Sequence, residues 1–215
     1  MIITIGGIKG GSGKSTVATT IAVLLAARGR DILLVDADDQ GTATDFTAFR
    51  EETLGQSGYT AIQLSGTAVR TEIQKMRSRY QDIVIDTGGR DTSSQRAALV
   101  VSDLFIVPFI PRSFDMWTLD SVLKLIEEMQ PANPSLQSFA LLNKTDHQGR
   151  DNEEAKGIIA EAVGIEYLDA PLGHRKSFAN AAASGLAVTE TKIRDDKAVA
   201  EANRLVDAVL SFETK

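Results

Sequence analysis

Short apolar runs alternate along the chain with longer stretches of helical periodicity, and this alternation predicts repeated strand–helix units. Seven runs rich in β-branched residues predict strands at 2–5, 31–35, 60–64, 82–85, 104–107, 139–142 and 165–168. Several, such as I-L-L-V and L-F-I-V, are apolar at every position, which is typical of parallel strands buried on both faces. The pattern predicts an α/β fold with a doubly wound, mostly parallel sheet flanked by helices.

The segments between these strands predict helices. Their expected ranges are 15–28, 42–52, 67–80, 93–101, 115–129, 152–163, 175–184 and 195–212. Gly29 follows the first range directly, where a glycine commonly ends a helix. The chain has no internal repeat and no linker-like change of composition, so we expect one domain over residues 1–215.

Composition narrows the classes of protein that the chain can represent. It has 215 residues, of which 43% are apolar and 24% charged, as in ordinary globular proteins. Cysteine is absent, which excludes disulfide frameworks, thiolate zinc sites and cysteine-ligated iron–sulfur clusters. A net charge of −6 argues against a protein that is basic throughout and binds nucleic acid on every face. No membrane span or signal peptide is evident, so we expect a cytoplasmic protein.

The strongest chemical signal is the run K-G-G-S-G-K-S-T at 9–16, which joins the first predicted strand to the first helix. Three glycines allow successive backbone N–H groups to face an anion, and the helix adds the positive end of its dipole. Lys14 can then reach the β- and γ-phosphates of a nucleotide, and the Ser15 hydroxyl can bind Mg²⁺. The alternative is a glycine turn with solvated lysines. The position between strand and helix favours a phosphate loop.

The loop departs from the usual phosphate-loop pattern in one respect. That pattern requires a glycine where this chain has Ile8, and the chain instead places Lys9 at the head of the loop. The run resembles the deviant Walker A motif, K-G-G-x-G-K-[ST], of the ParA/MinD family of P-loop ATPases. This resemblance implies ATP and Mg²⁺ as cofactors. It assigns nucleotide contacts to Gly10, Gly11, Ser12, Gly13, Lys14, Ser15 and Thr16.

The resemblance gives Lys9 a role across a dimer, because the corresponding lysine of the family reaches the partner's phosphates in a nucleotide sandwich. Two polyanionic nucleotides at one interface repel, and a cation from each side offsets that repulsion. Unit charges about 4 Å apart attract by about 4 kcal/mol at an effective dielectric constant of 20. Association itself costs about 4–15 kcal/mol. The alternative for Lys9 is an ordinary surface lysine.

Carboxylates follow two buried strands, at the edge of the sheet where ligands of doubly wound folds bind. The run D-I-L-L-V-D-A-D-D-Q ends in Asp36, Asp38 and Asp39, and D-I-V-I-D-T-G-G contains Asp86. The family pattern D-x-D-P-Q implies that Asp38 orients the attacking water and that Asp36 lies near Mg²⁺. Asp86 matches the Walker B carboxylate, which holds Mg²⁺ together with Ser15.

Asp39 and the glycine pair after Asp86 lie beside these carboxylates, and each has its own interpretation. Asp39 stands where the family has proline, which makes the loop less rigid and adds a negative charge; capping of the next helix is an alternative role for it. Gly88 and Gly89 permit a loop that we interpret as a sensor of the γ-phosphate, running to about Ser94.

The run L-L-N-K-T-D at 141–146 ends another strand and bears on the choice of base. In ParA-like proteins the strand-end asparagine, here Asn143, contacts adenine. The same letters fit the N-K-x-D pattern with which GTPases bind guanine, so GTP stays an alternative to the favoured ATP. The resemblance also assigns Pro171 to the other side of the base.

The run at 175–190 resembles the family's R-x-x-x-x-x-A-x-x-x-G-x-x-V-x-E stretch, and the length is close to that of small ParA-type proteins. This implies a partition or positioning ATPase that forms an ATP-dependent homodimer, binds DNA nonspecifically, and is stimulated by a ParB-like or cargo-adaptor protein. The expected location is therefore the cytoplasm, in association with the nucleoid. Salt should weaken such DNA binding steeply.

Two local groups of basic residues are candidates for the DNA contact. Residues 67–80 carry four basic side chains and one acidic side chain, and residues 171–206 carry six basic and four acidic side chains. Either group can instead be a solvated helix face.

Two other functions stay open. A MinD-like membrane ATPase requires a basic amphipathic C-terminal helix, but the tail from Ala202 contains Asp207 and Glu213 among its apolar residues, so we do not expect membrane binding. A kinase or ligase acting on a small metabolite can use the same phosphate loop.

Overall fold

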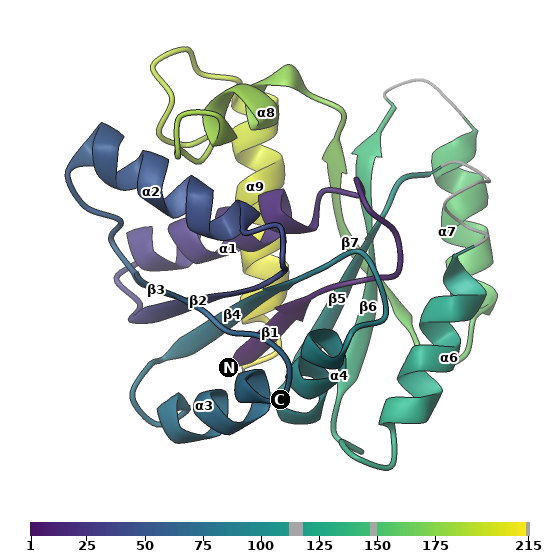
Figure 1. The fold of residues 1–215 in the computed structure, drawn as a ribbon. Coiled ribbons are helices and arrows are strands. Elements are labelled where there is room, and N and C mark those ends of the chain that lie inside the picture. Colours follow the sequence, from purple (N-terminus) through teal and green to yellow (C-terminus); the bar gives the residue numbers. More distant parts are fainter. Residues whose placement is uncertain (112–117, 147–149, 214–215) are drawn as a thin grey trace.

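A parallel sheet of seven strands runs through the molecule in the order β3-β2-β4-β1-β5-β6-β7 (Figure 1). The computed structural model describes residues 1–111, 118–146 and 150–213. Every predicted strand is present. Their bounds are β1 Ile2–Ile5, β2 Ile32–Ala37, β3 Thr60–Gln63, β4 Asp82–Thr87, β5 Leu104–Phe109, β6 Gln137–Thr145 and β7 Glu166–Gly173.

The last two strands extend further than the apolar runs that predicted them. β6 continues through Asn143 to Thr145, and β7 continues through Pro171 to Gly173. Their register shifts between Asn143 and Thr145. A proline is tolerated in β7 because this strand forms the edge of the sheet, where one row of N–H groups needs no partner.

The described helices agree with the predicted ranges to within a few residues at most ends. Their bounds are α1 Lys14–Ala27, α2 Thr42–Leu54, α3 Ala68–Met76, α4 Ser93–Val101, α6 Leu119–Met129, α7 Asp151–Glu161, α8 Lys176–Ala182 and α9 Asp196–Leu210. The helix expected from position 115 is described from Leu119 onwards; residues 115–117 lie outside the described residues. In the described part of the chain, no helix combines the length and the apolar character needed to cross a membrane.

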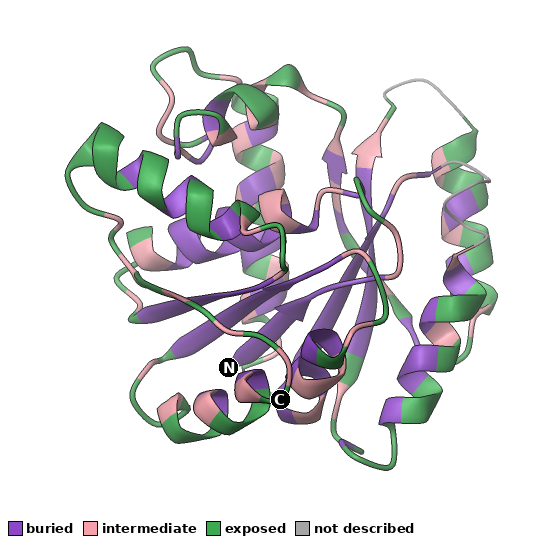
Figure 2. Ribbon diagram, viewed as in Figure 1, coloured by how far each residue is buried: buried purple, intermediate pink, exposed green. Residues whose placement is uncertain are grey.

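The helices cover both faces of the sheet. Helices α1, α2, α8 and α9 lie on one face, and α3, α4, α6 and α7 lie on the other (Figure 1). The sheet and the inner sides of the helices are buried, as Figure 2 shows. Helix α1 is buried from Val17 to Leu25 on almost every side, because it lies between the sheet and the helices of its layer. An all-round apolar helix fits that central position.

The strand order places the first loop at the point where the sheet changes direction. β1 pairs with β4 on one side and with β5 on the other, so successive connections leave it in opposite directions. In doubly wound sheets this point opens a crevice at the carboxyl ends of the strands. The phosphate loop follows β1 directly and therefore lies at that crevice.

Candidate functional site

The phosphate loop has the backbone geometry that its glycines predict. Gly11 and Gly13 adopt left-handed conformations, with φ of 79° and 92°. Gly13 occupies the N-cap position of α1 and contributes no side-chain cap, so no side chain competes with a ligand for the first N–H groups of the helix. The loop can therefore present these N–H groups to an anion, as the sequence predicts.

The end of β6 holds the loop from one side. The Asn143 side chain donates from Nδ2 to the Ser12 carbonyl at 2.7 Å, and Lys144 donates from Nζ to the Gly11 carbonyl at 2.8 Å. A Cβ atom at Gly13 would lie only 2.3 Å from the Asn143 amide nitrogen. Glycine is therefore required at position 13 for space as well as for backbone conformation. The contact of Asn143 with a base stays a prediction.

Lys14 lies in the centre of the loop and is buried. Its ammonium donates to the Lys9 carbonyl at 3.0 Å. Burial lowers the pKa of Lys14, although the nearby carboxylates of Asp86 and Asp38 act in the opposite direction. A lysine held in this way faces the carboxylates of the site. Lys9 itself is half-buried at the head of the loop.

Asp36 and Asp86 lie side by side, because β2 and β4 pair them in register. Asp36 accepts hydrogen bonds from the N–H and hydroxyl of Thr44, both at 2.8 Å, and from the Asp38 N–H at 3.1 Å. These bonds tie the end of β2 to α2. The oxygens of Asp36 are thus already hydrogen-bonded within the protein, and a role of Asp36 toward Mg²⁺ stays a prediction.

Asp86 is fully buried, and neither of its carboxylate oxygens accepts a hydrogen bond from the residues that the structure describes. The pKa of Asp86 is raised to about 7, mainly by burial; the nearby Ser15 hydroxyl and Lys14 act to lower this pKa, and Asp36 acts to raise it. A buried carboxylate without a partner is costly unless a cation or its water shell binds there. The residues therefore fit a hydrated Mg²⁺ between Ser15 and Asp86. No cluster of three acidic or histidine side chains suited to a metal occurs in the described residues.

Asp38 lies beside the loop that follows β4. Its Oδ1 accepts a hydrogen bond from the Gln40 N–H at 3.1 Å, and a Cβ atom at Gly88 would lie 3.1 Å from the same oxygen. Helix α2 is capped at Gly41 rather than by an aspartate side chain. Capping is thus not the role of Asp39, which lies exposed at the rim of the site.

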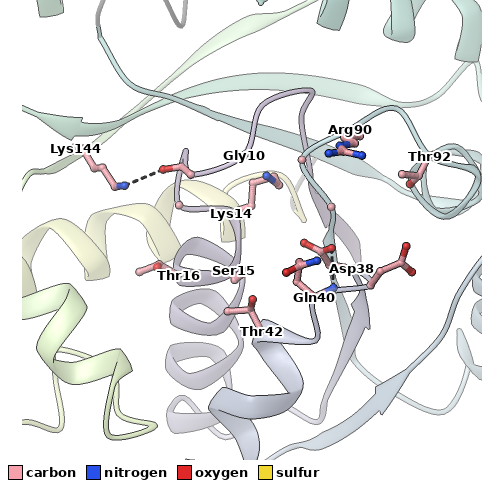
Figure 3. Close-up of a pocket in the computed structure, with 15 residues that line it drawn as sticks. Gly10, Lys14, Ser15, Thr16, Asp38, Gln40, Thr42, Arg90, Thr92 and Lys144 are labelled. Atoms are coloured by element: carbon pink, nitrogen blue, oxygen red, sulfur yellow. Dashed lines mark hydrogen bonds between the residues drawn. The ribbon is translucent and has the colours of Figure 1, made fainter.

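A cavity of about 690 Å³ opens over the loop (Figure 3). Of the predicted site residues, its lining contains Gly10, Gly11, Gly13, Lys14, Ser15, Thr16 and Asp38. The others lie outside the lining: Lys9, Ser12, Asp36, Asp86, Asn143 and Pro171. Asp36 and Asp86 lie below the cavity floor as buried strand-end residues.

The cavity also contains residues that the sequence did not assign to the site. These are Gln40, Thr42 and Lys144, together with Arg90 and Thr92, which lie on the loop expected to sense the γ-phosphate but were not assigned roles of their own; Asp39, Gly88 and Gly89, which the sequence analysis had placed near the site, also line the cavity. Arg90 follows two glycines directly after a strand-end aspartate, which is the signal that could have identified it. Lys144 has a φ of 56°, and no sequence pattern predicts that strained conformation.

The chain also matches a known sequence family over most of its length. A sequence model described as the CobQ/CobB/MinD/ParA nucleotide binding domain matches residues 3–188. The chain belongs to this family. The resemblance to ParA and MinD that the loop motif suggested is therefore confirmed, and so is the P-loop fold.

Individual proteins to which the chain is similar carry different names. Maintenance of carboxysome distribution protein A from Halothiobacillus neapolitanus is 24% identical over 209 residues, covering 97% of this chain and 95% of that protein. Protein ParA from Rhizobium radiobacter is 22% identical over 182 residues, covering 82% and 80%. The structure of cobyrinic acid a,c-diamide synthase from Mycobacterium smegmatis, solved with an ATP analogue and magnesium, is similar with a TM-score of 0.79 at 19% identity, covering 100% of this chain and 96% of that one. The last likeness shows the fold alone.

Proposed function

We propose that the chain is a partition or positioning ATPase that forms a homodimer around ATP and binds DNA nonspecifically in that state. The observation that carries the proposal is the geometry of the phosphate loop. Lys14 lies inside the loop. Lys9 lies at the head of the loop, and its backbone carbonyl accepts a hydrogen bond from the Lys14 ammonium. A second lysine at this position has no task in a simple phosphate loop, whereas it suits a site that meets another copy.

The proposed reaction is hydrolysis of the terminal phosphate of ATP. Asp38 accepts a hydrogen bond from a water molecule and so directs a lone pair of the water oxygen toward the γ-phosphorus. The water oxygen bonds to that phosphorus, the bond from the phosphorus to the β–γ bridging oxygen breaks, and one proton of the water passes to a phosphate oxygen, giving ADP and phosphate. Lys14 and the N–H groups of the loop stabilise the charge on the phosphate oxygens. Ser15 and Asp86 hold Mg²⁺, which supplies further charge neutralisation when bound.

Two further observations support ATP as the nucleotide. The cavity is large enough for a nucleotide, and the solved relative from Mycobacterium smegmatis holds an ATP analogue and magnesium. GTP stays the alternative, and direct comparison of the two affinities decides between them.

A ligase acting on a small metabolite is the second candidate function, because cobyrinic acid a,c-diamide synthase shares the fold. Partition and positioning are favoured because two relatives that align over most of this chain are named a maintenance of carboxysome distribution protein, from Halothiobacillus neapolitanus, and a ParA protein, from Rhizobium radiobacter. A ParB-like or cargo-adaptor protein that stimulates hydrolysis, and residence on the nucleoid, belong to the same proposal.

Light scattering with two variants tests the proposed cycle. Asp38→Ala removes the water-orienting carboxylate but not the phosphate loop, so it should accumulate as a dimer of the 23.1 kDa chain with ATP and Mg²⁺. Lys9→Ala should bind ATP and stay monomeric. With ADP, both variants and the unchanged protein should be monomeric. A Lys9→Ala protein that dimerises normally with ATP contradicts the role of Lys9, and an Asp38→Ala protein that never dimerises contradicts the cycle.

A further inference from the structure

Arg90 lines the cavity but has no role in the site as derived so far. It lies on the loop between β4 and α4, and its side chain makes no hydrogen bond or ion pair among the residues that the structure describes. Several other arginines are paired: Arg96 binds Asp91 at 2.6 Å, and Arg50 binds Glu190 at 2.7 Å. An unpaired guanidinium beside a phosphate loop is therefore free to bind a ligand.

The backbone on the near side of Arg90 is fixed against the phosphate loop. A Cβ atom at Gly89 would lie 2.7 Å from the Gly10 nitrogen and 2.9 Å from the Lys9 carbonyl carbon, so the two loops are in direct backbone contact. Gly88 lies against the Asp38 carboxylate in the same way. Glycines at both positions permit this contact, and a larger residue would push the two loops apart.

The backbone on the far side is fixed as well. The Thr92 hydroxyl caps α4 by accepting from the Gln95 N–H at 3.1 Å. The buried Gln95 side chain then accepts from the Gly7 N–H at 2.9 Å, at the start of the phosphate loop. Arg90 thus lies between two backbone segments that are each held against the phosphate loop. Such support holds a side chain in a productive position.

The position of Arg90 within the cavity indicates which part of a nucleotide it faces. Figure 3 shows Lys144 on one side of the phosphate loop and Arg90, Asp38 and Gln40 on the other. Lys144 lies next to Asn143, at the side where the base is expected. Arg90 shares its side with Asp38, the residue proposed to orient water at the γ-phosphorus. The terminal phosphate therefore lies on the side of Arg90.

We propose that Arg90 binds the γ-phosphate of the nucleotide held by its own chain and so distinguishes the triphosphate from the diphosphate. This inference rests on the proposed ATPase function. A guanidinium suits the task because it stays charged and can donate two parallel hydrogen bonds to phosphate oxygens. With ADP, the phosphate oxygens that it binds are absent. The loop between β4 and α4 would then lose one of its links to the nucleotide, and in this way hydrolysis is signalled to the adjoining helix.

Nucleotide affinities of an Arg90→Ala protein test this assignment. We expect affinity for AMPPNP with Mg²⁺ to fall about tenfold or more, as for a lost charged hydrogen bond, and affinity for ADP to stay within about twofold. Arg90→Lys should lose less affinity for AMPPNP, because lysine keeps the positive charge. Lys124→Ala is the matched control, since it removes an exposed cation on α6, away from the cavity. Thermal unfolding verifies that each variant is folded.

Three results would overturn the assignment. One is unchanged affinity for AMPPNP; another is an equal loss for AMPPNP and ADP, which a structural role would produce. The third is a loss of DNA binding with both nucleotide affinities intact, which would make Arg90 a DNA contact.

A second background separates this inference from the proposed function. In the Lys9→Ala protein, where dimerisation is expected to fail, the additional change Arg90→Ala should still lower the affinity for AMPPNP. If it disappears there, Arg90 acts across the interface and the assignment to its own chain is wrong. If the unchanged protein binds no ATP, the proposed function fails; if it binds ATP and dimerises but Arg90→Ala has no effect, only the role of Arg90 fails.

Discussion

At the scale of single residues, the site contains a buried carboxylate, Asp86, whose energetic cost a bound cation can offset. Asp86 is fully buried beside Asp36, and its pKa is raised to about 7, first of all by burial. Above that pH the carboxylate is charged without a hydrogen-bonded partner. Binding of Mg²⁺ would offset this cost, which links the stability of the protein to its ligand.

We therefore predict that Asp86→Asn stabilises the protein when nucleotide and Mg²⁺ are absent. Removal of the buried charge should raise the free energy of unfolding at pH 8 by about 2 kcal/mol. The raised pKa of Asp86 corresponds to a larger gain than this, but the buried amide of the variant has a cost of its own that offsets part of it. Urea unfolding in EDTA measures the change. Asp39→Asn, at an exposed position, should change it by less than about 0.5 kcal/mol. A clearly less stable Asp86→Asn protein would show that the carboxylate is already satisfied.

At the scale of elements, the sequence predicted those parts of the site that depend on neighbours along the chain. The phosphate loop and the carboxylates after β2 and β4 follow from local patterns, because strand, loop and helix are consecutive there. The clamp from Lys144 to Gly11 joins positions 133 residues apart, and the contact of Gly89 with Gly10 also depends on how strands are ordered. No periodicity in one segment carries that information. Arg90 differs from these contacts, because the local run D-T-G-G-R at 86–90 could have identified it.

One long-range pair between elements gives a prediction about pH. Arg50 on α2 is buried and binds both carboxylate oxygens of Glu190 at 2.7 Å. Burial acts to raise the pKa of Glu190, but the hydrogen bonds from Arg50 and from the Ala187 N–H outweigh it and hold the pKa below its usual value. A lowered pKa of this kind stabilises the fold above the unfolded pKa, and the stabilisation is lost as pH falls through the folded pKa.

Glu190→Gln should therefore lower the free energy of unfolding by about 2 kcal/mol at pH 7, because it leaves the buried Arg50 without its counter-charge. The difference from the unchanged protein should shrink between about pH 5 and pH 3, where Glu190 itself becomes protonated. Urea unfolding at pH 7, 5 and 3.5 follows this change. Glu72→Gln, which removes an exposed pair with Lys75, should cost less than about 0.5 kcal/mol at pH 7. A difference that is constant over this pH range would refute the explanation.

At the scale of the whole molecule, the question is how a chain of net charge −6 can bind DNA. The structure distinguishes the two candidate groups of basic residues. In residues 67–80, Lys75 pairs with Glu72 and Arg77 with Asp103, which leaves two cations without an acidic partner among the described residues. In residues 171–206, two of the six cations are paired, Arg175 with Glu201 and Arg194 with Asp196. Four have no ion pair within the part of the chain that the structure describes: Lys176, Lys192, Lys197 and Arg204.

The segment that carries the second group also reaches the phosphate loop. Ala182 and Ala183, at the end of α8, line a groove together with Ser15 and Thr16 of the phosphate loop and α1. Helix α3, which carries the first group, packs on the opposite face of the sheet. A change in the nucleotide can thus reach the second group through direct contact. A dimer would present two copies of it, so that the local positive charge doubles while the remaining surface stays acidic.

We predict that the group within residues 171–206 carries the proposed DNA binding. Lys192→Glu combined with Lys197→Glu should lower the affinity for nonspecific duplex DNA with ATP by about tenfold or more and reduce the dependence on salt, because fewer phosphates are neutralised. Arg70→Glu combined with Arg79→Glu makes the same change of charge on the opposite face and should have the smaller effect. Fluorescence anisotropy over a series of salt concentrations, with ATP and with ADP, measures both. Equal losses in the two double variants would mean that net charge alone governs binding, and equal binding with ATP and ADP would contradict control by the nucleotide.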